Sequence, residues 1–128
     1  KLKVITPYGV FYEGDIDSLN VCTKQGYLTI LPNHIPLVAP LAIDSMSYKA
    51  NKETRVCALA GGIMYVSSDE TKIIANACEY KEDIDINRAL EAKKRAEQRL
   101  EHKSTNINVT RAEAALKRAL NRIETFNK

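Results

Sequence analysis

Glycine and proline divide this sequence of 128 residues into two unlike parts. All five glycines and all four prolines lie at or before Gly62, and residues 83–128 contain neither. That second part is dense in Ala, Glu, Lys, Arg and Leu, which cost least in a helix, whereas Gly and Pro favour turns. The sequence therefore predicts a β domain over residues 1–82 and an α-helical domain over residues 83–128.

The first 82 residues alternate between short runs of β-forming residues and turn signals. The runs are residues 2–6, 10–12, 16–23, 27–31, 43–49, 55–60, 64–67 and 72–78. Many short strands are typical of a β-sandwich or a flattened barrel, and no helical pattern separates them as a parallel α/β sheet would require. We expect Gly61-Gly62 to form a turn between two strands, because it lacks the following Lys and the helix start of a phosphate-binding loop.

Three prolines mark residues 31–41 as a loop or an edge strand, because proline cannot donate to a central ladder. His34 lies in this segment without a nearby Ser, Cys or Asp in a catalytic pattern, and we interpret it as a structural or interface residue. We predict no catalytic residue and no metal site.

The three cysteines match no zinc or redox spacing and lie in apolar runs, which is typical of small buried side chains in a reduced, cytoplasmic protein.

Two helices are predicted in residues 83–128. Asp85 is suited to cap a helix that begins at Ile86, and Thr110 with Glu113 has the spacing of a capping box for a second helix. The polar residues 104–108 between them predict a short loop and therefore an antiparallel hairpin. The apolar stripes consist of Ile86, Ala89, Leu90, Ala96 and Leu100 in the first helix, and of Ala112, Ala115, Leu116, Ala119, Leu120, Ile123 and Phe126 in the second.

Alanine dominates these stripes, which bears on how firmly the hairpin is held. A buried methyl group contributes about 0.8 kcal/mol, and a leucine side chain contributes about three times as much. We therefore expect a hairpin near balance between a docked and an open state, and a ligand that binds one state would shift the balance. A permanently docked hairpin is the alternative that the sequence leaves open.

The helical part carries the positive charge of the chain. Residues 83–128 contain 11 Lys/Arg and 7 Asp/Glu, or +4, whereas residues 1–82 contain 8 and 9, or −1, which gives the formal net charge of +3. This asymmetry favours an anionic ligand or an acidic partner. A nucleic-acid-binding module with a basic helical arm is the alternative function, although no aromatic residues are interleaved with the arginines to stack on bases.

The arginines of both helices repeat at spacings of seven and four residues, which place each set on one helical face. The sets are Arg88, Arg95 and Arg99, and Arg111, Arg118 and Arg122. In an antiparallel hairpin, four of the six would converge at its open end near the β domain: Arg88, Arg95, Arg118 and Arg122. Converging guanidinium groups are suited to clasp phosphate, whereas surface ion pairs such as Glu91 with Arg95 are the alternative.

Four motifs stand in a specific order along the chain. They are Thr6-Pro7-Tyr8-Gly9, the stretch from Gly26 to Leu37, Gly61-Gly62, and residues 84–89 with the sequence Ile-Asp-Ile-Asn-Arg-Ala. Together they resemble the epsilon subunit of bacterial F-type, proton-translocating ATP synthase, and the resemblance covers essentially the whole chain. It implies an N-terminal β-sandwich of about ten strands followed by a C-terminal two-helix hairpin.

The resemblance also implies a place in an assembly. The epsilon subunit is a non-catalytic part of the central stalk, peripheral on the cytoplasmic face of the bacterial plasma membrane, and couples the gamma subunit to the c-subunit ring. His34 and Pro36 fall in the region that this family uses for rotor contacts. The C-terminal helices either fold against the sandwich or extend toward the alpha and beta subunits, where they restrain ATP hydrolysis.

In some members of this family the folded hairpin binds ATP without a metal requirement. Carried over position by position, the resemblance implies these ATP-binding residues: Glu79, Ile84, Asp85, Arg88, Ala89, Arg95, Arg118 and Arg122. This set contains all four arginines that the helical spacing places at the open end of the hairpin. The sequence therefore predicts a regulatory stalk subunit in which ATP stabilises the folded hairpin. No apolar run is long enough for a transmembrane helix.

Overall fold

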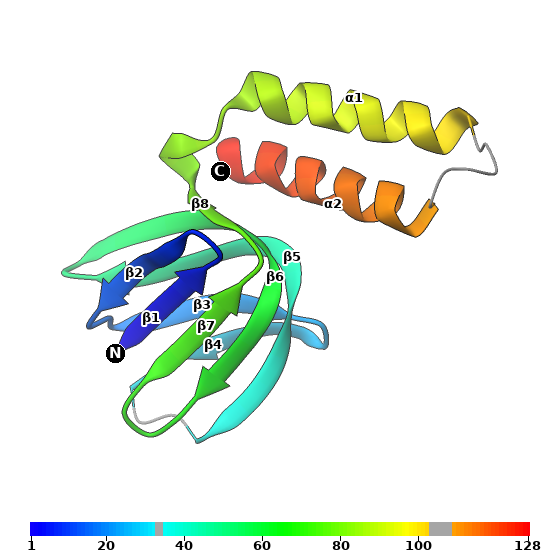
Figure 1. Ribbon diagram of the computed structural model, residues 1–128. Helices are drawn as coiled ribbons and strands as arrows, with labels where there is room; N and C mark the ends of the chain where they lie inside the picture. The colour runs from blue at the N-terminus through cyan, green and yellow to red at the C-terminus, as the bar shows by residue number, and fades with distance from the viewer. Residues whose placement is uncertain (33–34, 103–108) are drawn as a thin grey trace.

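A β-sheet body and a pair of long helices make up the computed structural model, which describes residues 1–32, 35–102 and 109–128 (Figure 1). The elements in chain order are β1 Leu2–Thr6, β2 Gly9–Gly14, β3 Ser18–Thr23, β4 Gly26–Ile30, β5 Leu37–Ala50, β6 Glu53–Val66, β7 Thr71–Ala75, β8 Cys78–Tyr80, the short 3₁₀ helix η1 Lys81–Asp83, α1 Ile86–His102 and α2 Val109–Phe126.

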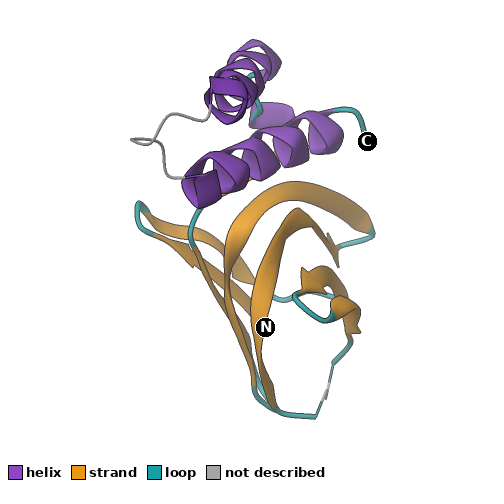
Figure 2. Ribbon diagram, turned by 90° about the vertical axis from the view of Figure 1, so that its right-hand side faces the viewer, coloured by secondary structure: helices purple, strands orange, loops and turns teal. Residues whose placement is uncertain are grey.

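The strands form one sheet that folds over on itself, so that its two halves enclose the core (Figure 2). The strand order is β2-β1-β7-β6-β5-β3-β4, and β8 pairs with β6. Every pair is antiparallel except β1 with β7. β5 and β6 have 14 residues each and curve from one half to the other. The predicted sandwich with a C-terminal hairpin is confirmed, and the described strands number eight because β5 and β6 replace several shorter ones.

The core between the two halves is aliphatic. Its fully buried large side chains come from five strands and include Leu2, Leu19, Leu41, Met46, Leu59, Met64 and Ile73. Inward residues alternate with outward ones, as in β7, where Thr71, Ile73 and Ala75 are buried and the two residues between them are exposed. Of the cysteines, only Cys57 is fully buried, whereas Cys22 and Cys78 are half-buried, so the prediction that all three are core residues is right for one.

Gly61-Gly62 is not a turn, and the prediction there is wrong. Both residues lie inside β6, where Gly62 pairs with Leu41 on one side and Ala75 on the other. A Cβ atom on Gly62 would lie 2.2 Å from the carbonyl oxygen of Ile74, and the φ of Gly62 is +146°. Close approach of two strand backbones, not chain reversal, therefore explains this glycine.

The proline-rich segment is also more regular than predicted. From Leu37 onward it is strand β5, which lies between β6 and β3, so Pro40 is in an interior strand opposite Ile63. The carbonyl oxygen of Pro40 accepts a hydrogen bond from the amide of Lys24 at 3.1 Å, next to a shift in the pairing of β3 with β5. Strand irregularity at this point accommodates a residue without an N–H group.

Turn and cap chemistry fix the remaining boundaries. Asn51 and Lys52 both have positive φ, 53° and 67°, in the two-residue turn that joins β5 to β6. Asp85 caps α1 as predicted, since its Oδ1 atom accepts a hydrogen bond from the amide of Arg88 at 3.2 Å. α2 already begins at Val109, so Thr110 lies inside its first turn rather than at the predicted cap. The predicted loop at 104–108 lies outside the described residues.

The two helices form an antiparallel layer against the sheet. α2 packs on β5 and β6, and α1 packs on α2 (Figures 1 and 2). The predicted hairpin is confirmed, and α2 is the helix that joins it to the body.

Candidate functional site

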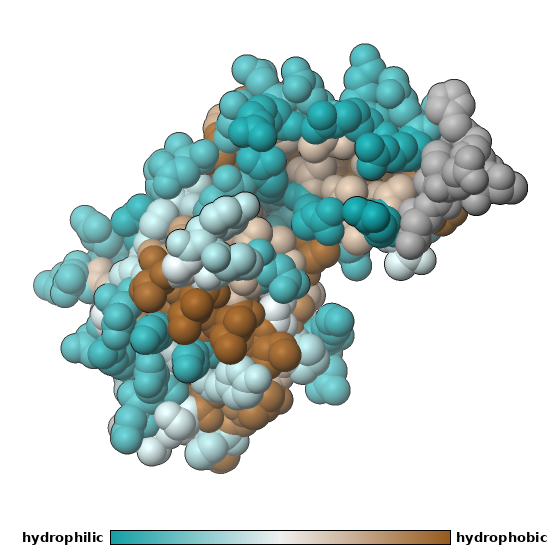
Figure 3. Space-filling view, in the orientation of Figure 1, coloured by the Kyte–Doolittle hydropathy of each residue, from teal (hydrophilic) through white to brown (hydrophobic). Residues whose placement is uncertain are grey.

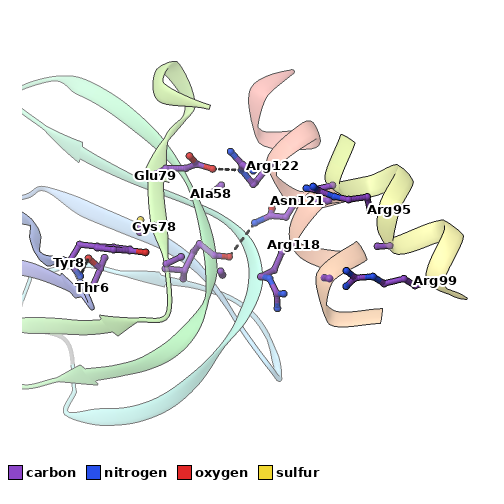
Figure 4. A pocket seen from close by; sticks show the side chains of 17 residues that line it. Thr6, Tyr8, Ala58, Cys78, Glu79, Arg95, Arg99, Arg118, Asn121 and Arg122 are labelled. Atoms are coloured by element: carbon purple, nitrogen blue, oxygen red, sulfur yellow. Dashed lines mark hydrogen bonds and ion pairs between the residues drawn. The ribbon is translucent and has the colours of Figure 1, made fainter. Parts of the chain in front are cut away.

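A cavity of about 570 Å³ opens where the helical hairpin meets the sheet (Figure 4). Its walls come from the β1–β2 turn, the central part of β6, the segment of β8, and both helices. The lining residues are Thr6, Tyr8, Ala58, Leu59, Ala60, Ala77, Cys78, Glu79, Ala92, Arg95, Ala96, Arg99, Ala115, Arg118, Ala119, Asn121 and Arg122. Ligand pockets for drug-sized molecules have volumes in this range, about 300–1,000 Å³.

The helix side of the cavity is strongly basic. Arg95 and Arg99 come from α1, and Arg118 and Arg122 come from α2, each pair separated by four residues and therefore on one face of its helix. Glu79 is the one acidic residue among those that line the cavity, and it pairs with Arg122. Four guanidinium groups against one carboxylate leave a positive site of the kind that attracts phosphate or carboxylate ligands.

The ion pair of Glu79 with Arg122 connects β8 to α2. Both side chains are partly shielded, with exposed fractions of 31% and 28%. The Nε–H of Arg122 donates to Oε1 of Glu79, so the orientation of this guanidinium is set by the sheet rather than by solvent. Arg122 is thus the most fixed of the four arginines.

A chain of hydrogen bonds holds α2 to the sheet beside the cavity. The Nδ2–H group of Asn121 donates to the carbonyl oxygen of Leu59 in β6 at 3.2 Å, and Thr125 donates to Oδ1 of Asn121 at 3.4 Å. The hydroxyl of Thr125 also lies 2.7 Å from that of Ser45 in β5. Asn121 and Thr125 are both buried, so this chain, which we call the α2 latch, satisfies polar groups that water does not reach.

The contact between the helices is made mainly of small side chains. The buried apolar residues of α1 and α2 are Ala89, Ala96, Ala112 and Ala119, whereas Leu90 and Leu120 keep exposed fractions of 47% and 36%. The predicted alanine seam is confirmed, while the predicted apolar stripe was too broad. Small side chains let the helices approach closely and leave the arginine side chains beside the seam on the cavity side (Figure 4).

The predicted site residues fall into two groups. Glu79, Arg95, Arg118 and Arg122 line the cavity together. Ile84, Asp85, Arg88 and Ala89 do not line it: they form the start of α1, where Ile84 and Ala89 are buried, Asp85 is the cap and Arg88 is exposed. Their contact with ATP stays a prediction, and in this structure they fix the base of the hairpin.

Sequence reasoning left out several cavity residues. Arg99 belonged to a recognised set of arginines, and its position four residues after Arg95 could have placed it here. Asn121 stands within the second apolar stripe, four residues before Thr125, and a buried polar pair at this spacing is a detectable signal. Thr6 and Tyr8 come from the far end of the sequence, and only the three-dimensional fold brings them to the cavity.

A tyrosine cluster anchors β8, the strand that carries Glu79. The hydroxyls of Tyr48 and Tyr80 lie 2.7 Å apart, and the guanidinium carbon of Arg55 lies 4.1 Å from the centre of the Tyr80 ring. Burial raises the pKa of both tyrosines. Where β8 pairs with β6, a hydrogen bond with the Cys78 thiol and burial raise the pKa of the Cys57 thiol.

Pro36, one of the two predicted rotor-contact residues, lies at the other end of the body (Figure 1). Pro36 is exposed just before β5, and its neighbours Ile35 and Val38 have exposed fractions of 79% and 67%. His34 lies outside the described residues.

Within residues 1–32, 35–102 and 109–128 there is no group of three or more metal-ligating side chains. In that part of the chain, no helix is long and apolar enough to cross a membrane.

Comparison with family models decides the relationship of this chain. Residues 1–81 match the beta-sandwich domain of the ATP synthase Delta/Epsilon chain, and residues 82–127 match its long alpha-helix domain. The chain belongs to the ATP synthase delta/epsilon family. Members of this family are non-catalytic stalk subunits, so the prediction that the chain is not itself an enzyme is confirmed by its family.

Curated relatives agree with this assignment over nearly full length. The ATP synthase epsilon chain of Bacillus licheniformis is 44% identical over 124 residues, which are 97% of this chain and 95% of that one. The epsilon chain of Halalkalibacterium halodurans is 46% identical over 124 residues, 96% of this chain and 93% of that one. The predicted resemblance is confirmed.

Solved structures share the fold at low sequence identity. A chain in the mitochondrial ATP synthase of Euglena gracilis has a TM-score of 0.79 at 17% identity and covers 91% of this chain and 74% of that one. A chain in the central stalk and c-ring of the Tetrahymena thermophila mitochondrial enzyme has a TM-score of 0.61 at 14% identity, with coverages of 98% and 92%.

Proposed function

We propose that this chain is the epsilon subunit of a bacterial F-type ATP synthase and acts in the central stalk between the gamma subunit and the c-subunit ring. The family and the near full-length relatives support this role, and the Tetrahymena thermophila chain that shares the fold comes from a central stalk and c-ring assembly. In this role the chain is peripheral on the cytoplasmic face of the plasma membrane and takes part in proton-driven ATP synthesis.

An apolar row across the outer face of the sheet supports a rotor contact. The residues that stand opposite one another on five adjacent strands are Val10, Ile5, Ile74, Ile63 and Pro40. Val10, Ile74 and Ile63 have exposed fractions of 57%, 47% and 42%, and a brown band crosses the body in Figure 3. A contiguous apolar patch on a folded surface marks a binding surface, and in our proposal gamma covers it.

We also propose that the cavity between the hairpin and the sheet binds ATP. The observation that carries this proposal is the convergence of Arg95, Arg99, Arg118 and Arg122 on a cavity with one carboxylate. Guanidinium groups pair with phosphate oxygens through two parallel N–H donors, and four of them with one carboxylate leave a net positive site for an anionic triphosphate. Glu79 orients Arg122 and does not itself meet phosphate, because like charges repel.

ATP bound there would act as a clamp. The cavity exists only while α1, α2 and the sheet are in contact, since all three provide its walls. A ligand that binds the docked state and not the open one shifts the population toward the docked state. At low ATP the helices would open and extend toward the alpha and beta subunits, where they would restrain ATP hydrolysis.

Calorimetry with ATP tests the site. We expect Arg118→Ala and Arg122→Ala to weaken ATP binding about tenfold or more, because a hydrogen bond to a charged group is worth about 1.5–3 kcal/mol. Lys94, which is exposed on α1 and does not line the cavity, provides the matched control as Lys94→Ala. Arg88→Ala separates a direct contact with ATP from a role at the base of the hairpin.

The outcome that would reject ATP binding is clear. If the wild-type chain binds no ATP, or if both cavity variants bind ATP as well as Lys94→Ala does, the cavity is not a nucleotide site. The stalk role would then stand on the family alone.

A further inference from the structure

Two cysteines that are far apart in the sequence lie next to each other where β8 pairs with β6. Cys57 in β6 pairs with Tyr80 in β8. Two residues before Tyr80, Cys78 pairs with Leu59 of β6. Residues that stand opposite one another, and residues two apart along one strand, have their side chains on the same face of a sheet. Cys57 and Cys78 are therefore diagonal neighbours on the face that packs into the core.

The two thiols are in contact but differ in how easily a reagent reaches them. A hydrogen bond with the Cys78 thiol, together with burial, raises the pKa of the Cys57 thiol. Cys57 is fully buried, whereas Cys78 is half-buried and lines the cavity (Figure 4). Oxidants react with the thiolate form of an accessible cysteine, and burial suppresses that form. Cys78 is thus the thiol that reacts first, and Cys57 is placed to react with the product.

Cys22 is a cysteine of similar exposure in a different setting. It is half-buried in β3, where it pairs with Tyr27 of β4. Burial, with a smaller effect from the Asp44 carboxylate, raises the pKa of its thiol. Because Cys22 and Cys78 are both half-buried, a difference in their oxidation products would come from the neighbouring thiol and not from exposure.

We propose that Cys57 and Cys78 form a site of reversible oxidation, at which hydrogen peroxide converts the two thiols into a disulfide between β6 and β8. The sulfur of Cys78 attacks one peroxide oxygen and the O–O bond breaks, which gives a sulfenic acid and a hydroxide that leaves as water with the proton of this thiol. The sulfur of Cys57 then attacks the sulfenic sulfur, the S–O bond breaks, and the second hydroxide leaves as water with the proton of Cys57. The electron pair that the sulfurs lose reduces the peroxide to water.

The disulfide fastens the strand that connects the sheet to α2. A diagonal pair is wider than a directly opposite pair, so closing the bond draws β8 toward β6. β8 has only three residues and pairs with β6 off the main path of the sheet, so it can make that shift. Glu79 follows Cys78 directly, and its ion pair with Arg122 connects β8 to α2. Oxidation therefore fixes the position of this connection.

Peptide mapping of the full wild-type chain tests the bond without any substitution. The chain is treated with hydrogen peroxide, the remaining thiols are blocked with iodoacetamide, and trypsin digestion is carried out without reductant. Trypsin cuts after Lys and Arg, so Cys22, Cys57 and Cys78 fall in separate peptides, residues 4–24, 56–72 and 73–81. We expect residues 56–72 and 73–81 to be joined and to separate on addition of dithiothreitol, while residues 4–24 stay unlinked.

Three variants test the order of the steps. In Cys57→Ala the sulfenic acid at Cys78 has no thiol to condense with, so it should accumulate and react with dimedone. In Cys78→Ala the buried Cys57 should remain a thiol. Cys22→Ala is the control and should form the cross-link as wild type does.

Hydrogen exchange measures whether the bond fastens β8. The amides of β8 should exchange about tenfold or more slowly in the oxidised chain than in the reduced chain, because the disulfide restricts local opening. Equal exchange in the two forms would overturn the proposed effect on β8.

Other results would reject the oxidation site itself. If residues 56–72 and 73–81 stay separate after peroxide treatment, whether Cys78 remains a thiol or is oxidised to a sulfinic acid, the pair is not a disulfide site. Cross-links from Cys22 in equal amount would show that the reaction does not follow the folded arrangement. These measurements contain no ATP, so the inference stands or fails separately from the proposed nucleotide site.

Discussion

The α2 latch gives the sharpest prediction about how the hairpin is held. Thr125→Val replaces a hydroxyl by a methyl group of similar shape and keeps a β-branched side chain, so the helix itself is little affected. Thr125 is fully buried, and its hydroxyl lies 2.7 Å from that of Ser45 in β5. The variant leaves the Ser45 hydroxyl and Oδ1 of Asn121 without this partner.

The size of the effect follows from comparing the cost of the lost hydrogen bond with the other interactions that hold the hairpin closed and docked on the sheet. Leaving a buried polar group unsatisfied costs about 1–3 kcal/mol, and the lower end applies here because Ser45 is only half-buried and the bond to Oδ1 of Asn121 is long, at 3.4 Å. The four buried methyl groups of the alanine seam together contribute about 3 kcal/mol, at about 0.8 kcal/mol each. Thr125→Val should therefore raise the population of undocked hairpin about fivefold.

Hydrogen exchange measures this population directly. Amides of α1 and α2 that exchange through undocking should exchange about fivefold faster in Thr125→Val, whereas amides in the core strands should not change. Thr110→Val, the same substitution at an exposed site in the same helix, is the control and should leave the rates unchanged.

A double variant separates the latch from a general packing effect. Ser45→Ala removes the hydroxyl that Thr125→Val leaves unpaired, so the pair of changes should be less costly than Thr125→Val alone. Equal exchange rates for Thr125→Val and wild type, or a double variant whose costs simply add, would show that this hydrogen bond does not hold α2 on the sheet.

Two further outcomes follow from the body. Gly62→Ala should lower the free energy of unfolding by about 3 kcal/mol or more, because its Cβ would lie 2.2 Å from a backbone oxygen. Gly26→Ala, with a φ of 128° but open space around it, should lower it less. Urea unfolding that ranks the two variants in the opposite order would refute the steric argument. Burial raises the pKa of Tyr48 and Tyr80 above the ordinary value of 10.0, so the folded state keeps these protons at a pH where the unfolded state has lost them. The stability that these groups contribute should therefore be fully present below about pH 10 and fall above it. In a Tyr48→Phe variant, whose ring cannot ionise, thermal unfolding should show a smaller loss of stability at alkaline pH.

The architecture could be predicted from the sequence because its signals are local. Turn residues and β-forming runs determine the body, and the cap at Asp85 and the alanine spacing determine the hairpin. Gly61-Gly62 was misread because a glycine pair signals a turn far more often than a close strand contact, and only the packing of β6 against β7 distinguishes the two. Pro40 was misread for a related reason, since the pairing shift beside it is a tertiary feature.

The candidate site could be predicted only where it depends on helical periodicity. Spacings of four and seven placed Arg95, Arg118 and Arg122 on facing surfaces, and the cavity brings them together. Periodicity cannot give the axial position of the cavity along the hairpin, which is why Arg99 lines it and Arg88 does not. Nor can it give the contribution of the sheet, because Tyr8 lines the cavity although it lies more than 80 residues before the helix residues that line it.

Arg122 takes part both in holding α2 on the sheet and in lining the cavity. Its pair with Glu79 fastens α2 to β8, and the same guanidinium lines the cavity one residue after Asn121 of the latch. Undocking α2 therefore removes the cavity, and a nucleotide at a hundred times its dissociation constant would stabilise the docked state by about 2.7 kcal/mol. That is close to the contribution of the whole alanine seam. A seam built from leucine would be too strong for such a ligand to control, so the abundance of alanine in the helices agrees with our proposal that a ligand in the cavity stabilises the docked state.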